Sequence, residues 1–143
     1  GRYMATVLPT ETPQYAFADL LELNKLLNDK ENKEPKLIVA GENFGTGSSR
    51  EQAVSALVGC NAIVIAKSFA RIFSQNSINL GLQTVICPEI EAEIGDDLEI
   101  NDNKVINHTK NREYNIIPIP EARKAIVDAG GLIAYTRKRL VNR

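Results

Sequence analysis

The sequence has little of several residue types on which common catalytic and metal sites depend. Its 143 residues include no tryptophan, one histidine, one methionine and two cysteines. Cys60 and Cys87 lack the spacing of metal ligands and adjoin apolar runs, so we expect buried free thiols and no metal site in this chain. His108 lies in a polar stretch typical of a turn, where a lone histidine is more often a surface residue than a catalyst.

The sequence also lacks an excess of either charge and any long apolar run. Its 17 basic and 18 acidic residues give a formal net charge of −1, which excludes a strong electrostatic drive toward nucleic acid or an anionic membrane. No run approaches the length of a membrane span and no signal segment opens the chain, so a cytoplasmic protein is the default expectation. With 43% hydrophobic residues, the chain predicts one domain, residues 1–143, without repeats or linkers.

The hydrophobic pattern predicts an α/β fold with two kinds of strand. Continuous apolar runs predict buried strands at Leu37–Ala40, Ala62–Ala66 and Thr84–Cys87. Helical patterns between them, at 53–58 and from Phe69 to about Ile78, indicate a parallel sheet with right-handed crossovers. Alternating stretches after Pro88 predict short antiparallel strands at Asp97–Ile100, Lys104–Ile106 and Tyr114–Ile117. Two helices follow, from Pro120 to about Ala129 and from Leu132 to Val141, separated by Gly130 and Gly131, and the basic residues of the second are expected on a solvated face.

Local chemistry adds three narrower expectations. Gly59 is suited to a left-handed cap at the end of the helix predicted at 53–58. Ser68 is placed to cap the start of the helix predicted from Phe69 to about Ile78. Phe69, Ile72, Phe73 and Ile78 are expected to form the apolar face of that helix.

A glycine-rich stretch from Gly41 to Ala53 joins the first buried strand to the following helix. Glycines permit tight turns and close approach of a ligand, and a helix start offers unpaired N–H groups to an anion. Arg50 adds a guanidinium that matches a carboxylate, so the stretch predicts an anion site beside a serine hydroxyl. Capping boxes, Ser48 with Glu51 and Ser49 with Gln52, explain the same residues about as well on local chemistry alone. The stretch matches neither the phosphate-loop nor the dinucleotide pattern.

Two long motifs identify a resemblance that covers essentially the whole chain. The segment Gly41–Glu51 resembles the swivelling-domain motif of the aconitase superfamily, and Lys67–Phe73, followed by Asn76, Asn79, Gly81 and Leu82, resembles its second motif. Among its members, the chain is most similar to the stand-alone small subunits of 3-isopropylmalate dehydratase and homoaconitase. The opening Gly1-Arg2-Tyr3-Met4 and the closing 129–132 segment also resemble these subunits.

The resemblance implies a three-layer β/β/α swivelling domain, with a mixed sheet that has a parallel core and short antiparallel strands. It implies a hydro-lyase that moves a hydroxyl between adjacent carbons of a hydroxy acid by dehydration and rehydration. A [4Fe–4S] cluster would be held by a partner large subunit, over which this chain closes, and this chain would bind no cofactor. Members of the family usually begin with a further strand, whose absence here would expose a sheet edge.

The resemblance also implies the roles of individual residues. Ser48 would take the substrate proton, and Ser49 and Arg50 would help to hold the substrate. The loop of Tyr3, Met4, Ala5 and Thr6 would contact the variable group of the substrate. The remaining candidates are expected to scaffold the site: Gly45, Gly47, Arg71, Asn76 and Asn79. For the last three, simple hydrogen bonding to the neighbouring loop is a competing explanation.

Substrate choice depends on few residues. Ala5 offers a small apolar contact, which favours the isopropyl group of 3-isopropylmalate over the additional carboxylate of homoaconitate. Thr46 and Gln52 look more like the homoaconitase subunits, so homoaconitate is the alternative substrate. Two other classes stay open: a non-catalytic anion-binding module and a purely structural or regulatory subunit.

Overall fold

The structure is a computed structural model of the whole chain, and it describes residues 36–45, 51–93, 95–101 and 103–141. The side chains of residues 51–53 are outside this description. So are the candidate residues Tyr3–Thr6 and Gly47–Arg50, and the expectation of a further strand before Gly1 also lies outside the described residues.

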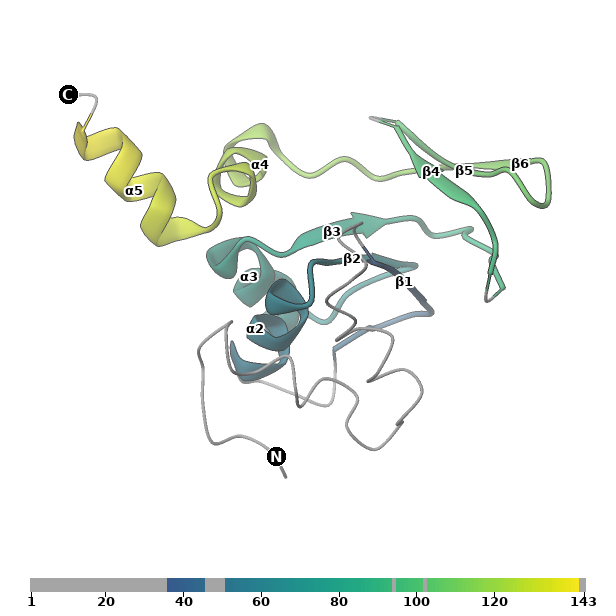
Figure 1. Cartoon of the computed structure of the whole chain (residues 1–143), viewed down its shortest axis with the longest axis horizontal. Helices are drawn as coiled ribbons and strands as arrows, with labels where there is room; N and C mark the ends of the chain where they lie inside the picture. The colour runs from purple at the N-terminus through teal and green to yellow at the C-terminus, as the bar shows by residue number, and fades with distance from the viewer. Residues whose placement is uncertain (1–35, 46–50, 94, 102, 142–143) are drawn as a thin grey trace.

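A parallel sheet of three strands forms the middle layer of the described structure (Figure 1). Its strands are β1 (Lys36–Ala40), β2 (Ala62–Ala66) and β3 (Gln83–Ile86), in the order β1-β2-β3. The register pairs Ala40 with Ala66 and Ala66 with Ile86, so the carboxyl ends of the strands meet at one edge. This arrangement confirms the parallel core predicted from the continuous apolar runs.

Two helices, α2 (Glu51–Gly59) and α3 (Arg71–Leu80), cover one face of this sheet (Figure 1). Between helices and sheet lies a core whose members include Val54, Leu57, Val64, Phe73 and Leu82, each less than 5% exposed. Burial of such side chains stabilises the layer by roughly 1.5–3 kcal/mol each.

The other face of the parallel sheet is covered by an antiparallel sheet of β4 (Leu98–Ile100), β5 (Lys104–Asn107) and β6 (Arg112–Asn115). A second core fills the space between the two sheets: Ile65, Cys87, Ile90, Val105 and Tyr114. The layers are therefore β/β/α, as the resemblance implied. The last strand begins and ends two residues before the predicted Tyr114–Ile117, because the chain leaves this sheet and Ile117 bridges to Ile86 of the parallel sheet.

Helices α4 (Glu121–Asp128) and α5 (Leu132–Val141) follow, with the predicted break at Gly130 and Gly131. Both glycines have positive φ, and a Cβ on Gly131 would lie 2.5 Å from the carbonyl oxygen of Asn79. The end of α3 therefore packs closely against this break. No residue of α5 is buried, which confirms the solvated face expected for its basic residues.

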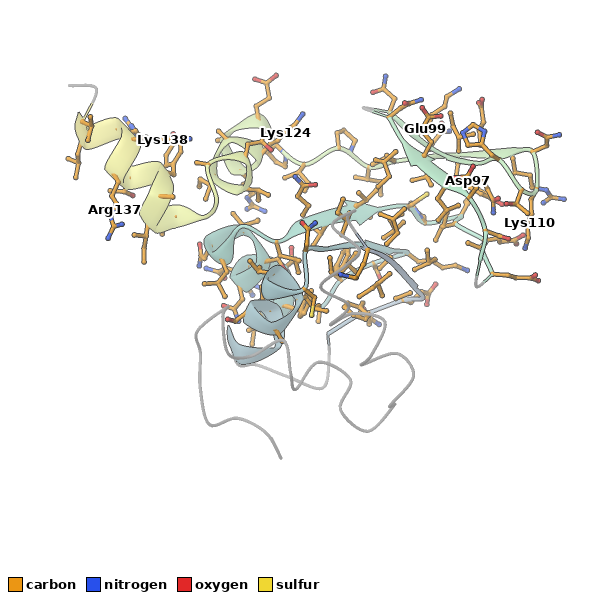
Figure 2. The ribbon with its side chains drawn as sticks, in the orientation of Figure 1. Asp97, Glu99, Lys110, Lys124, Arg137 and Lys138 are labelled. Carbon is orange, nitrogen blue, oxygen red and sulfur yellow. The ribbon has the colours of Figure 1, made fainter. Side chains whose placement is uncertain are left out.

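Figure 2 shows charged side chains of both signs at the antiparallel sheet, Lys110 beside Asp97 and Glu99. Basic side chains also lie on α5, where Figure 2 labels Arg137 and Lys138. Among the described residues, no helix is long and apolar enough to span a membrane.

Two local expectations were wrong. The left-handed residue after α2 is Asn61, with φ 56°, rather than Gly59, because the chain continues for two residues before it turns into β2. Ile72 is 52% exposed, so it is not part of the buried face of α3. The helix begins at Arg71 and buries Phe73 and Ser77, and Ile72 is about 100° around the axis from Phe73.

Candidate functional site

The two motif segments lie side by side where β1 and β2 end. Phe44 and Phe69 form a parallel bridge, in which the Phe44 N–H donates to the Ser68 carbonyl at 3.0 Å. The Ala70 N–H donates to the Phe44 carbonyl at 2.9 Å, and the Lys67 N–H donates to the Gly41 carbonyl at 3.2 Å. Pairing of the strands thus continues into both loops, and the structure brings together two motifs that are about 25 residues apart in sequence.

A side-chain bond reinforces this pairing. The Asn43 N–H donates to Ser68 Oγ at 2.8 Å, and Asn43 adopts a left-handed conformation with φ 54°. Asparagine tolerates this conformation better than most residues do. The expectation that Ser68 caps α3 was wrong: the N-cap residue is Ala70, without a side-chain capping bond, because the Ser68 hydroxyl accepts from the neighbouring loop instead.

Three phenylalanines, one from the first motif and two from the second, pack against one another. The rings of Phe44 and Phe73 meet edge to face with centroids 5.2 Å apart, and those of Phe69 and Phe73 stack at 6.0 Å. Such aromatic pairs contribute about 0.5–1.5 kcal/mol beyond the area they bury. The periodicity of α3 indicated Phe69 and Phe73 as core residues, but only the fold shows that they support the motif loop.

Gly45 is held against this aromatic cluster. Its φ is 92°, and a Cβ built on it would lie 2.4 Å from Cγ of Phe73. A side chain is therefore excluded here both by the backbone conformation and by the ring. The prediction that Gly45 belongs to the scaffold of the site is consistent with this contact.

The other predicted scaffold residues are distributed along α3. Arg71 is the first residue of the helix, two residues after Phe69, and its side chain is exposed. Within the described part of the chain, no acidic side chain pairs with it. Asn76 and Asn79 are half-buried, and Asn79 is eight residues from Arg71, about 12 Å along the axis. Arg71 is therefore much nearer than Asn79 to the bridge between the motifs.

The residues expected to do the chemistry, Gly47, Ser48, Ser49 and Arg50, lie outside the described residues, as does the loop of 3–6. Only their two flanks are described. Gly45 precedes them on the aromatic cluster, and α2 begins at Glu51, directly after Arg50. A helix that begins at this point is what an anion site at a helix start requires.

The remaining candidate groups are elsewhere. Cys60 and Cys87 are buried free thiols, as predicted, and burial raises the pKa of both. His108 is exposed, with Nε2 2.9 Å from Glu99 Oε2, as expected for a surface residue. Among the described residues, no three His, Cys, Asp or Glu side chains gather as metal ligands.

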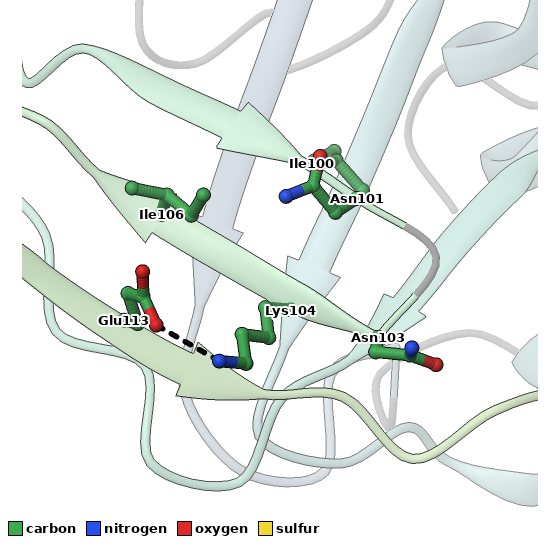
Figure 3. A pocket seen from close by; sticks show the side chains of 6 residues that line it. All are labelled: Ile100, Asn101, Asn103, Lys104, Ile106 and Glu113. Atoms are coloured by element: carbon green, nitrogen blue, oxygen red, sulfur yellow. Dashed lines mark hydrogen bonds and ion pairs between the residues drawn. The ribbon is translucent and has the colours of Figure 1, made fainter.

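An open pocket of about 580 Å³ lies on the antiparallel sheet (Figure 3). Its charged lining residues, Lys104 and Glu113, form an ion pair with Nζ and Oε2 2.9 Å apart. Because the lysine is already paired, the pocket offers no free cation to an acid substrate, and the bridge between the motifs remains the candidate site.

Comparison with known proteins identifies the family. The model of the aconitase C-terminal domain matches residues 11–89, which include both motifs. The chain belongs to the aconitase C-terminal domain family. This aconitase-type chain is 45% identical to the 3-isopropylmalate dehydratase small subunit of Hydrogenobaculum sp. (strain Y04AAS1), over 98% of the chain and 86% of that protein. It is 43% identical to the subunit of the same name from Methanosarcina mazei, over 100% of the chain and 88% of that protein.

A solved structure confirms the fold class. The crystal structure of 3-isopropylmalate dehydratase (leuD) from Methanocaldococcus jannaschii superposes with a TM-score of 0.85 at 40% identity. The match covers 99% of this chain and 84% of the other. The aconitase-type architecture therefore extends over the antiparallel sheet and the last two helices, beyond the residues that the family model matches.

Proposed function

We propose that the chain is the small subunit of a 3-isopropylmalate dehydratase. In this function it interconverts 2-isopropylmalate and 3-isopropylmalate by dehydration and rehydration, in the cytoplasmic biosynthesis of leucine, and it is active only with a large subunit. The main support is that the two motif segments are bonded together at the carboxyl ends of β1 and β2, in a chain that matches small subunits of that name along its length. The ends of parallel strands are where α/β proteins commonly bind ligands.

The iron–sulfur cluster would belong to the partner subunit. The large subunit would hold a [4Fe–4S] cluster that binds the substrate hydroxyl and one carboxylate. Among the described residues of this chain, no three His, Cys, Asp or Glu side chains gather as metal ligands. This chain supplies the acid–base group and cations for the substrate.

Ser48 is the proposed base. A serine hydroxyl is a poor base in water, and it can act as an alkoxide only where positive charge and aligned N–H donors stabilise the anion. Ser48 is three residues before Glu51, where α2 begins, so it is close in sequence to the positive end of the helix dipole. Arg50 adds a full charge. Ser48 would take the proton from the carbon next to the one that loses the hydroxyl, and return it in the reverse step.

Ser49 and Arg50 are the proposed ligands of a substrate carboxylate. Arg71 is a candidate for a second anionic group, because it begins α3 beside the bridge between the motifs and has no acidic partner among the described residues. The loop of 3–6 would contact the isopropyl group, with Ala5 as the small apolar contact. Homoaconitate is the alternative substrate.

The test is an assay of the chain coexpressed with the large subunit of its host. We expect turnover of 3-isopropylmalate, none by the chain alone, and little or none of homoaconitate assayed in parallel. Ser48→Ala should lower kcat by at least about 100-fold, the usual size of a general-base contribution, without loss of assembly. Ser74→Ala, which removes a hydroxyl from α3, is the control and should retain activity.

A fully active Ser48→Ala complex would refute the assigned base. Calorimetry of the isolated chain tests the main non-enzymatic alternative. Tight binding of inorganic phosphate or a nucleotide without any partner would favour an anion-binding module instead.

A further inference from the structure

We propose that Ser68 is a positioning residue: its hydroxyl holds the start of the segment that carries Ser48. The role of the segment rests on the function proposed above. Ser68 itself is on the second motif, and it contacts two consecutive residues of the first. Its Oγ accepts from the Asn43 N–H at 2.8 Å, and its carbonyl accepts from the Phe44 N–H at 3.0 Å.

The two bonds have different consequences. The bond to Phe44 is backbone to backbone, so substitution of Ser68 leaves it in place. The bond to Asn43 depends on the hydroxyl, and it holds a residue that is in the left-handed region at φ 54°. Asparagine tolerates this region better than most residues do, but negative φ is still preferred, so the bond helps to hold the turn. Without the hydroxyl, the Asn43 N–H loses its partner, and this turn is held only by the flanking backbone bonds at Gly41 and Phe44.

The position of Asn43 matters because the next two residues are anchored on the aromatic cluster. Phe44 inserts among the rings of Phe69 and Phe73, and Gly45 is held against Phe73. Residues 46–50 then connect Gly45 to the start of α2. Loss of a bond at the first of these two ends therefore loosens one attachment of the segment that carries Ser48.

The hydroxyl contributes to the site more than to the fold. The bond between Asn43 and Ser68 is exposed, and neither residue belongs to the core between helices and sheet. Removal of the hydroxyl leaves an exposed N–H that water can satisfy. Catalysis is less tolerant, since a displacement of about 1 Å can lower a rate by about 100-fold.

The experiment compares three variants in the assembled enzyme. Ser68→Ala removes the bond, and Ser68→Thr retains a hydroxyl. Thr109→Ala is the matched control, because Thr109 Oγ1 accepts from the Asp97 N–H at 2.9 Å, an equally exposed bond of the same kind on the antiparallel sheet. We expect Ser68→Ala to lower kcat by about 10- to 100-fold with KM within about 3-fold, the pattern for loss of positioning rather than of ground-state binding. Ser68→Thr and Thr109→Ala should keep kcat within about 3-fold of the parent, the usual range for a change that leaves positioning intact.

A second measurement does not depend on activity. Amide hydrogen exchange of the full chain should show the Asn43 N–H exchanging at least about 10-fold faster in Ser68→Ala, and the Asp97 N–H faster in Thr109→Ala. If the assembled parent enzyme fails to turn over isopropylmalate, the proposed function fails while this measurement still tests the bond.

Three results would overturn the proposal. The first is a Ser68→Ala complex with at least half the parental kcat. The second is unchanged exchange at Asn43 in that variant. The third is a Ser68→Thr complex as impaired as Ser68→Ala although its Asn43 amide stays protected, because the hydroxyl bond would then not be what the enzyme needs.

Discussion

Replacement of Gly45 by alanine should destabilise the chain more than the same change at Gly41 or Gly95. The added Cβ would lie 2.4 Å from Cγ of Phe73 and 2.5 Å from its Cβ. Real Cβ atoms do not approach other carbons this closely. Because Cβ of Phe73 is itself too near, rotation of the ring cannot make room. Either the motif loop or α3 has to move.

Two costs add at this position. Alanine at φ 92° carries the strain of a left-handed conformation, about 1–2 kcal/mol. Forcing a methyl group into a packed contact costs about 1–3 kcal/mol more. We therefore expect Gly45→Ala to lower the free energy of unfolding by about 2–5 kcal/mol, or the melting temperature by roughly 6–15 °C for a chain of this size.

Two other glycines separate these costs. Gly95 has nearly the same φ, 91°, but a Cβ there would meet nothing within 4 Å, so Gly95→Ala should show the backbone cost alone. Gly41 has neither a positive φ nor a neighbour within 4 Å, and Gly41→Ala should change stability by less than about 1 kcal/mol.

Urea unfolding of the parent and the three variants, followed by circular dichroism, gives the comparison. The predicted order of destabilisation is Gly45→Ala, then Gly95→Ala, then Gly41→Ala. If Gly45→Ala and Gly95→Ala are equally stable, the contact with Phe73 is not close enough to matter, and the account of the aromatic cluster as a rigid support for the motif loop is wrong.

Two further predictions concern titratable groups. The Glu93 N–H and the Asn107 side-chain amide both donate to the Asp96 carboxylate, and these bonds, the first more than the second, hold its pKa below the ordinary value of 3.8. The ionised carboxylate therefore stabilises the fold above about pH 4, and this stabilisation is lost as the pH falls through the lowered pKa. The advantage of the parent over Asp96→Asn in urea unfolding should therefore shrink between pH 5 and about pH 2, and an advantage independent of pH would contradict this reasoning. Cys60 and Cys87 are 4% and 0% exposed, and burial raises the pKa of both thiols. A thiol reagent at about pH 8 should therefore label neither cysteine in the native chain within minutes, and both in urea. Rapid labelling of either cysteine in the native chain would show that the core around it opens readily.

Hydrophobic pattern alone determined most of the secondary structure. The run Ala62–Ala66 is apolar throughout because β2 is the central strand and contributes to the cores on both faces of the sheet. The run Leu37–Ala40 is also a strand at nearly the predicted bounds, although Leu37 is 37% exposed. The break between the last two helices was equally predictable from Gly130 and Gly131, because the backbone there has a positive φ that few other residues adopt. The two motifs also identified the family from sequence, since their length and separation are specific.

Tertiary structure decided which partner each polar or small group meets. From local sequence, the Ser68 hydroxyl is expected to accept a hydrogen bond from an N–H of the helix that follows it, because those N–H groups are the nearest in sequence. Pairing of β1 with β2 brings the Asn43 N–H nearer in space, so the hydroxyl accepts from that group instead. Gly45 is comparable: its conformational freedom was evident from sequence, but the ring that requires its bare Cα comes from 28 residues further along the chain. Contacts between distant segments depend on register and packing, which no local pattern encodes.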